Sequence, residues 1–178
     1  MFLYKFIFNT VLGWKLHGDF SPHIKKSIVI VVPHTSWHDF FIGVLTRGIS
    51  GTLINWVGKK ELFTWPFGYY FRYMGGAALD RTSGQNKVDA IAQIFNDNKE
   101  FRMAMAPEGT RKKVDTWKTG YYYIAQKANA PIITVAFDYE HKEVRIGKPY
   151  YITNDLEKDT EVLRSFFKGV KGKKPENS

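Results

Sequence analysis

The segment SIVIVVPHTSWHD, residues 27–39, contains a strand and the polar turn that follows it. Ser27–Val32 is an almost continuous run of Ile and Val, which is typical of a parallel strand buried on both faces. Pro33 has no backbone N–H to donate and ends the run. We expect a helix from about Trp37 to Thr46, so the segment predicts a strand–turn–helix unit.

Outward from this unit, short hydrophobic runs alternate with segments of helical periodicity. We expect further strands at 52–57, 76–79, 101–106, 132–138, 144–146 and 150–152, and helices at 87–98, 121–128 and 161–170. This alternation predicts a single α/β domain over residues 19–170, with a largely parallel central sheet flanked by helices. Ligands of such sheets lie beyond the carboxyl ends of the strands.

The two ends of the chain have a different character. Residues 1–18 are expected to contain an amphipathic helix that faces the membrane, and its apolar side chains recur at helical spacing: Leu3, Ile7, Val11 and Trp14. This helix packs on its own domain or lies in the bilayer interface, and the pattern leaves both alternatives open. Residues 171–178 are rich in lysine and are expected to form a flexible basic tail.

The composition limits the possible chemistry. A formal charge of +9 points to an anionic partner, which could be a phosphate ligand, an acidic membrane surface or a nucleic acid. There is no recognised nucleic-acid-binding motif and no clustered basic helix. The absence of cysteine excludes disulfides, cysteine-ligated zinc and a thiol nucleophile. No uncharged apolar run is long enough to predict a membrane-spanning helix.

A candidate acid–base pair follows the first strand. His34 lies in the strand-to-helix turn and Asp39 in the first turn of the expected helix. Residues five apart do not share a helix face, but a turn between them can bring the carboxylate to the imidazole. The carboxylate would then fix the tautomer and leave the other ring nitrogen free as a base. Alternatively, both residues have only structural roles. His38 is expected to point elsewhere.

Two further polar clusters follow strands. Pro107–Arg111 comes directly after the strand at 101–106, where Gly109 would let backbone amides approach a ligand and Arg111 would bind a phosphate through two hydrogen bonds. Arg81 ends the cluster that begins at Gly75. Each cluster taken alone could equally be a surface turn with a solvated charge.

Together, the order and spacing of these clusters resemble the glycerolipid acyltransferase family, typified by lysophosphatidic acid (1-acylglycerol-3-phosphate) acyltransferases. The family's first motif places a Ser two positions and an Asp five positions after a His, as His34, Ser36 and Asp39 do here. Its Pro-Glu-Gly-Thr-Arg motif is matched without a gap at Pro107–Arg111. Arg81 and Pro131–Val135 match the second and fourth motifs. Three departures leave the proposed catalytic pair intact: Pro33, Ala106 and Thr134.

The resemblance implies transfer of a fatty acyl group from acyl-CoA or acyl-acyl carrier protein to a hydroxyl of lysophosphatidate or a similar lysolipid. It implies His34 as the general base and Asp39 as the residue that orients it. Six residues would bind substrate: Ser36, Arg81, Glu108, Gly109, Thr110 and Arg111. No cofactor and no metal are implied, because the histidines are isolated and cysteine is absent.

The resemblance also implies partners and a location. We expect a lipid acceptor, an acyl donor that could be acyl carrier protein, and an anionic membrane surface, but no nucleic acid. The chain would attach to the cytoplasmic face as a peripheral or monotopic protein, with Trp14 and Trp65 at headgroup depth. The alternatives are an acyltransferase for a lyso-aminolipid without phosphate, a basic nucleic-acid-binding domain, and a non-catalytic lipid-binding homologue. The last would need a broken His/Asp pair.

Overall fold

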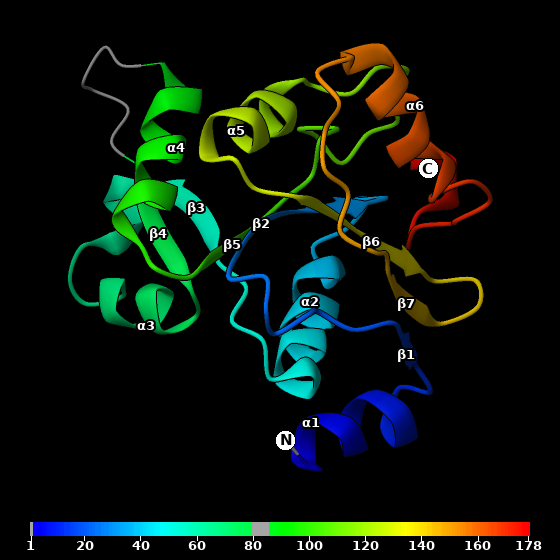
Figure 1. Cartoon of the computed structure of the whole chain (residues 1–178). Helices are drawn as coiled ribbons and strands as arrows, with labels where there is room; N and C mark the ends of the chain where they lie inside the picture. Colours follow the sequence, from blue (N-terminus) through cyan, green and yellow to red (C-terminus); the bar gives the residue numbers. More distant parts are fainter. Residues whose placement is uncertain (1, 80–85) are drawn as a thin grey trace.

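The computed structural model describes residues 2–79 and 86–178, and its centre is a five-stranded sheet in the order β1-β7-β6-β2-β5 (Figure 1). The strands are β1 Lys15–His17, β2 Lys26–Val32, β5 Phe101–Met105, β6 Ile132–Asp138 and β7 Glu143–Ile146. All neighbouring pairs are parallel except β6 and β7. The prediction of an α/β domain with a largely parallel sheet is therefore confirmed.

A second, two-stranded sheet lies beside the first. It pairs β3 (Trp56–Lys59) with β4 (Gly76–Leu79) in parallel, and Asn55 bridges it to Met103 of β5. The short helices η2 (Lys60–Phe63) and α3 (Gly68–Tyr73) connect its strands. Residues 62–73, which are rich in aromatic side chains, therefore belong to a crossover on the β5 side of the central sheet (Figure 1).

The longer helices cover both faces of the central sheet. α4 (Lys87–Asp97), α5 (Gly120–Ala128) and α6 (Leu156–Ser165) lie on one face, and α2 (His38–Ser50) lies on the other with the N-terminal helices (Figure 1). The pleat of β2 directs Ile28 and Ile30 into the cluster under α4, α5 and α6. It directs Val29 into the cluster that contains Phe8 and Ile42. β2 is thus buried on both faces, as its apolar run predicts.

The N-terminal segment differs from the expected amphipathic helix. α1 (Phe2–Lys5) continues as the π-helix η1 (Phe6–Val11), and β1 then joins the sheet. The wider π-helical turn changes which side chains face inward, so Phe8 is buried and Val11 is exposed. Trp14 is only 5% exposed and packs edge-on against Tyr139. The prediction of Trp14 at headgroup depth is therefore wrong, because the core holds this ring.

Two elements near the C-terminus differ from the strand expected at 150–152 and the helix expected at 161–170. Residues 150–152 form no strand, because Tyr150 makes only an isolated bridge to Ile132. The closing helix begins at Leu156 and ends at Ser165, which is earlier than the expected range of 161–170. Asp155 sets its start, since the side chain of Asp155 accepts a hydrogen bond from the Lys158 amide at 3.1 Å.

The segment 171–178, expected to be flexible, instead packs beside the turn that carries His34. The Lys174 amide donates to Thr35 Oγ1 at 3.1 Å, and the Tyr139 amide donates to the Lys171 carbonyl at 2.9 Å. Gly172 approaches the turn so closely that a Cβ there would lie 2.6 Å from Thr35 Oγ1. η3 (Pro175–Asn177) follows. Lysine content alone did not reveal these backbone contacts.

Candidate active site

The turn after β2 wraps around the carboxylate of Asp39. Asp39 Oδ2 lies 3.0 Å from His34 Nδ1 and accepts hydrogen bonds from the amides of Thr35 and Ser36, also at 3.0 Å. The Asp39 side chain is buried at the start of α2, where the helix dipole favours a negative charge. The turn therefore brings the predicted pair together, through contacts that a continuous helix would not allow.

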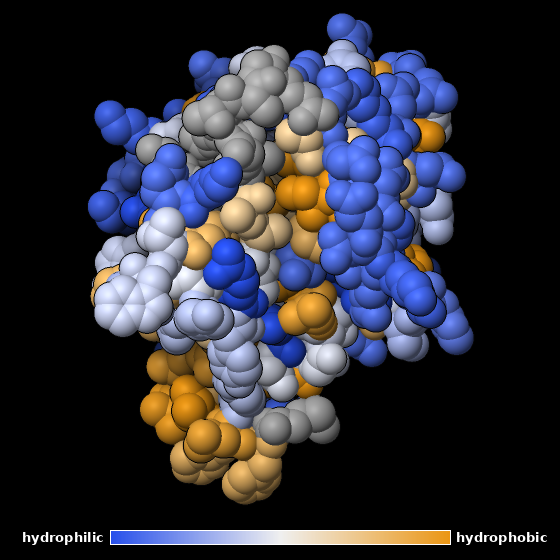
Figure 2. Space-filling model, turned by 90° about the vertical axis from the view of Figure 1, so that its left-hand side faces the viewer, coloured by the Kyte–Doolittle hydropathy of each residue, from blue (hydrophilic) through white to orange (hydrophobic). Residues whose placement is uncertain are grey.

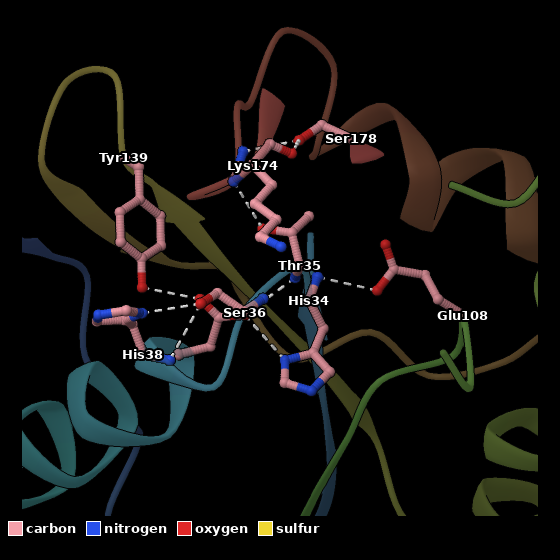
Figure 3. A network of polar contacts seen from close by, with 10 residues as sticks. His34, Thr35, Ser36, His38, Glu108, Tyr139, Lys174 and Ser178 are labelled. Carbon is pink, nitrogen blue, oxygen red and sulfur yellow. Dashed lines mark hydrogen bonds and ion pairs between the residues drawn. The ribbon is translucent and has the colours of Figure 1, made fainter. Parts of the chain in front are cut away.

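Tyr139 completes the surroundings of Asp39, and the sequence analysis missed it. Its hydroxyl donates to Asp39 Oδ1 at 2.8 Å (Figure 3). Tyr139 follows β6 directly, and β6 pairs in parallel with β2, so both strands end at the same edge of the sheet. The rule that ligands lie beyond the carboxyl ends of strands, applied to 132–138, would have indicated this residue.

Opposing effects act on the acidity of Asp39. Burial raises the pKa of this carboxyl, but hydrogen bonds from His34, the Ser36 amide and Tyr139 outweigh it, so the pKa lies below its ordinary value. Burial and the hydrogen bond to Asp39 raise the pKa of the Tyr139 hydroxyl. Asp39 is therefore a carboxylate at neutral pH, and Tyr139 stays a hydrogen-bond donor.

An ionised Asp39 fixes the tautomer of His34. Nδ1 carries the hydrogen that bonds to the carboxylate, which leaves a lone pair on Nε2. The His34 side chain is 31% exposed and lines a pocket of about 300 Å³. The walls of this pocket are mostly apolar and come from β2, α2, β5 and β6. A basic nitrogen thus lies beside an apolar cavity.

Glu108 supports the same turn from the other side. Its Oε2 accepts a hydrogen bond from the His34 amide at 2.9 Å, and the side chain is buried (Figure 3). Burial raises the pKa of Glu108. The structure therefore joins the first and third motifs through a side chain that was predicted to bind substrate.

The other residues of the third motif lie at the surface. Gly109 has a φ of 64°, which favours glycine, and a Cβ there would lie 2.6 Å from Lys118 Nζ. Thr110 Oγ1 accepts a hydrogen bond from the Lys112 amide at 3.3 Å. The Arg111 side chain is exposed. Arg81, predicted to bind phosphate, falls outside the described residues.

Ser36 and His38 form a contact of their own. Ser36 Oγ lies 2.9 Å from His38 Nδ1, and the His38 ring stacks against Trp37 with a centroid distance of 4.1 Å. The polar contact of the His38 ring is therefore with Ser36. Within residues 2–79 and 86–178, no group of three or more His, Cys, Asp or Glu side chains is arranged to hold a metal ion.

One known protein family matches most of the chain. The family model named Acyltransferase matches residues 14–138. The chain belongs to the Acyltransferase family. The match includes His34, Asp39 and Glu108, whereas Tyr139 and the segment 171–178 lie beyond it. The last two features therefore belong to the part of this acyltransferase-family chain that the family model does not describe.

Two proteins that are similar to this acyltransferase-family chain are named for their function. Over 99 residues it is 32% identical to a 1-acyl-sn-glycerol-3-phosphate acyltransferase from Haemophilus influenzae, an alignment that covers 52% of this chain and 41% of the relative. The chain thus matches less than half the length of that relative. A crystal structure of the 1-acyl-sn-glycerophosphate (LPA) acyltransferase PlsC from Thermotoga maritima has the same fold, with a TM-score of 0.59 and 19% identity over 88% of this chain and 72% of that one.

Proposed function

We propose that this chain transfers a fatty acyl group from a thioester donor to a hydroxyl of lysophosphatidate or a similar lysolipid. The observation that carries this proposal is the His34–Asp39 pair, which lies beside an apolar pocket in a chain of the Acyltransferase family. The donor is acyl-CoA or acyl-acyl carrier protein.

The proposed reaction needs no side-chain nucleophile. His34 Nε2 takes the proton of the acceptor hydroxyl as the oxygen attacks the acyl carbonyl carbon. The carbon–sulfur bond then breaks, and the leaving thiolate receives the proton from His34. Asp39 stabilises the imidazolium between these two steps, and Tyr139 and the amides of the turn hold Asp39 in place. The His34 ring ends the cycle neutral, as it began.

The apolar pocket is the proposed site of the fatty acyl chain. Val31 of β2 and Val44 of α2 form part of its wall, together with Met105 of β5 and Val135 of β6. An acyl chain placed there would have its carbonyl near His34, which lines the same pocket. Burial of each methylene group would contribute about 0.8 kcal/mol to binding.

The acceptor phosphate is assigned to Arg111 and Arg81, as the family resemblance implies. Arg111 is exposed and free to make a bidentate contact. Ser36, Gly109 and Thr110 would contribute nearby polar groups. Glu108 accepts a hydrogen bond from the His34 amide, so we propose that it positions the base and does not contact the acceptor.

The test is product analysis with a panel of lysolipids. Lysophosphatidate, other lysophospholipids and a lyso-aminolipid without phosphate are each offered with acyl-CoA and with acyl-acyl carrier protein, and products are identified by mass spectrometry. We expect phosphatidate as the main product. Preferred acylation of the lyso-aminolipid would establish the alternative acceptor, and no acylated lipid from any combination would refute the proposal.

We further propose peripheral or monotopic attachment to an anionic membrane surface. Within the described part of the chain, no helix is both long and apolar enough to span a membrane. Large apolar side chains are instead exposed near the N-terminus and around α3, among them Phe2 at 85%, Trp65 at 84% and Tyr73 at 82%. Figure 2 shows apolar side chains gathered at the end of the molecule where α1 lies. Lys5 and Lys15 are exposed and would attract anionic lipid.

Vesicle flotation tests this attachment without deleting the N-terminus, whose Phe8 and Trp14 belong to the core. Phe2→Ser with Trp65→Ser should reduce binding to anionic vesicles. Tyr151→Ser removes an aromatic ring that is 65% exposed elsewhere and serves as the control. Equal flotation of all three proteins would rule out the proposed surface. The cytoplasmic face stays a prediction.

A further inference from the structure

A second cavity lies beside the turn that carries His34, and basic side chains line it. It measures about 780 Å³. Its basic residues come from two distant segments: Arg111, Lys112 and Lys113 after β5, and Lys173 and Lys174 near the C-terminus. Thr35, Ser36, Trp37, His38 and Asn177 form the rest of the lining, which includes no acidic side chain among the described residues. We call this cavity the basic groove.

The charges of the basic groove are not neutralised within the described chain. All five basic side chains are exposed, and none takes part in an ion pair with a described residue. Lys171, two residues before Lys173, does pair with Glu140 outside the groove. Several like charges around one cavity repel one another, and an anionic ligand would relieve that repulsion.

The backbone holds the two halves of the groove together. The Lys174 amide donates to Thr35 Oγ1, and Gly172 packs against the same threonine. Lys173 Nζ lies 5.8 Å from the centre of the Tyr139 ring. The C-terminal lysines are therefore positioned by contacts with Thr35, in the turn that carries His34, and with Tyr139.

The groove and the His34 ring lie on opposite sides of this turn. Figure 3 shows Lys174 on the side of Thr35, with the His34 ring directed the other way. His34 and Asp39 line the apolar pocket, whereas Thr35 and Ser36 line the groove. An acceptor has only a few bonds between its phosphate and its reacting hydroxyl, so its phosphate must stay near His34. A ligand of the groove needs a longer reach.

Coenzyme A has that reach, because the pantetheine arm separates its thioester from its diphosphate and 3′-phosphate. We propose that the basic groove binds these phosphates through Lys112, Lys113, Lys173 and Lys174. Arg111 lines the groove as well and would contact the same phosphates, which leaves the acceptor phosphate to Arg81 on this inference. This inference rests on the proposed acyl transfer and selects acyl-CoA as the donor. It also makes the C-terminal segment part of the donor site.

Steady-state kinetics of the full chain test the proposal. The double variant Lys173→Ala/Lys174→Ala keeps the backbone contacts of the segment and removes two charges. It should raise the KM for oleoyl-CoA about tenfold or more, because charge-assisted contacts are lost. The kcat and the KM for lysophosphatidate should hardly change. Lys148→Ala/Lys158→Ala removes two exposed charges outside the groove and is the matched control.

A binding measurement separates this inference from the proposed function. Adenosine 3′,5′-bisphosphate carries nucleotide phosphates like those of coenzyme A but has no thioester. Calorimetry measures its binding to the protein without requiring acyl transfer. It should bind the wild type, and this binding should weaken as the salt concentration increases. Its affinity for Lys173→Ala/Lys174→Ala should be lower by about tenfold or more. This result would stand even if no lysolipid were acylated.

Three results would overturn the inference. The first is equal affinity of the bisphosphate for the wild type and the groove variant. The second is a rise in the KM for lysophosphatidate instead of oleoyl-CoA, which would assign the groove to the acceptor. The third is a rise in KM for acyl-acyl carrier protein alone, which would assign it to an acidic protein surface. Thermal unfolding of both double variants checks that the fold is intact.

Discussion

Two buried aspartates, Asp39 and Asp159, are satisfied in similar ways at opposite faces of the sheet. Asp39 accepts hydrogen bonds from Tyr139, two backbone amides and His34. Asp159 of α6 accepts from Tyr122 and Tyr150 and from the amide and hydroxyl of Thr153. In both cases burial raises the pKa, but the hydrogen bonds lower it by more, so each carboxyl has a pKa below its ordinary value.

The difference lies in what surrounds each network. The partners of Asp159 are hydroxyls and an amide, and the pKa of both Tyr122 and Tyr150 is raised to about 12, so none of them exchanges a proton near neutral pH. Asp39 has a histidine partner whose ring lines a pocket. A buried, hydrogen-bonded carboxylate therefore does not by itself indicate an active site. The feature that distinguishes the Asp39 network is the imidazole of His34, which has access to a cavity.

Removing the imidazole should have the largest effect. His34→Ala should lower acyl transfer by about 10²–10⁴-fold, the range for positioned proton transfer. The melting temperature should hardly change, because the lost ring is partly exposed. His38→Ala, which loses only the contact with Ser36, is the control and should retain most of the activity. A His34→Ala protein with near-normal turnover would refute the general-base mechanism.

Neutralising Asp39 should come next. Asp39→Asn can still accept from His34 and the two amides if its NH₂ group faces the Tyr139 oxygen, so the fold should survive. The imidazolium would lose its counter-charge, and kcat should fall by about 10²-fold. The measurement is kcat with both substrates saturating. An unchanged kcat would show that the charge of Asp39 does not assist the reaction.

The same substitution in the other network should act on stability instead. Asp159→Asn weakens four hydrogen bonds in a fully buried site and should lower the free energy of unfolding by about 2–4 kcal/mol. The kcat per folded molecule should stay the same, since the site lies on the other face of the sheet. Urea unfolding gives the first quantity, and active-site-normalised kinetics give the second. Loss of kcat in the folded variant would contradict the comparison.

The tyrosines give a smaller and more selective contrast. Tyr139→Phe removes one hydrogen bond to a charged group and should lower kcat by about tenfold, with both KM values unchanged. Tyr122→Phe removes the equivalent hydroxyl from Asp159 and should lower stability but not kcat. If Tyr122→Phe lowered kcat as much as Tyr139→Phe, the effect of Tyr139 would be a general loss of packing.

The two networks should resemble each other most in how their contribution to the free energy of unfolding depends on pH. Because both carboxyls have a lowered pKa, each stabilises the fold fully above its unfolded value of about 4, and this contribution is lost as the pH falls through the lower folded pKa. Urea unfolding at neutral and acid pH should show a smaller acid-induced loss for Asp159→Asn than for the wild type. A steeper loss in the variant would contradict this sign.

The sequence was sufficient for features that depend on local patterns. The apolar runs at 76–79 and 132–138 are strands with the expected bounds, and the turn after β2 brings His34 to Asp39 as its polar residues indicated. Both features follow from the period of apolar side chains and from a proline that ends a strand.

Features that depend on distant contacts were not accessible in this way. Tyr139 bonds to a residue a hundred positions earlier, and Trp14 is buried because its ring meets Tyr139. A helical period of apolar residues could not distinguish a membrane-facing stripe from one that packs on the core. The packing of residues 171–178 depends on a glycine that fits against Thr35, which no charge count reveals.

The close contact between Gly172 and Thr35 has a consequence for the sequence. A Cβ at position 172 would also lie 2.7 Å from Thr35 Cγ2 and 3.1 Å from Pro33, so a larger residue there would displace the segment 171–178 or the turn that carries His34. A side chain at 172 would therefore need a smaller residue at 35 or a shift of one of the two segments. The turn that carries His34 thereby restricts the residue that can occupy a position far away in the sequence.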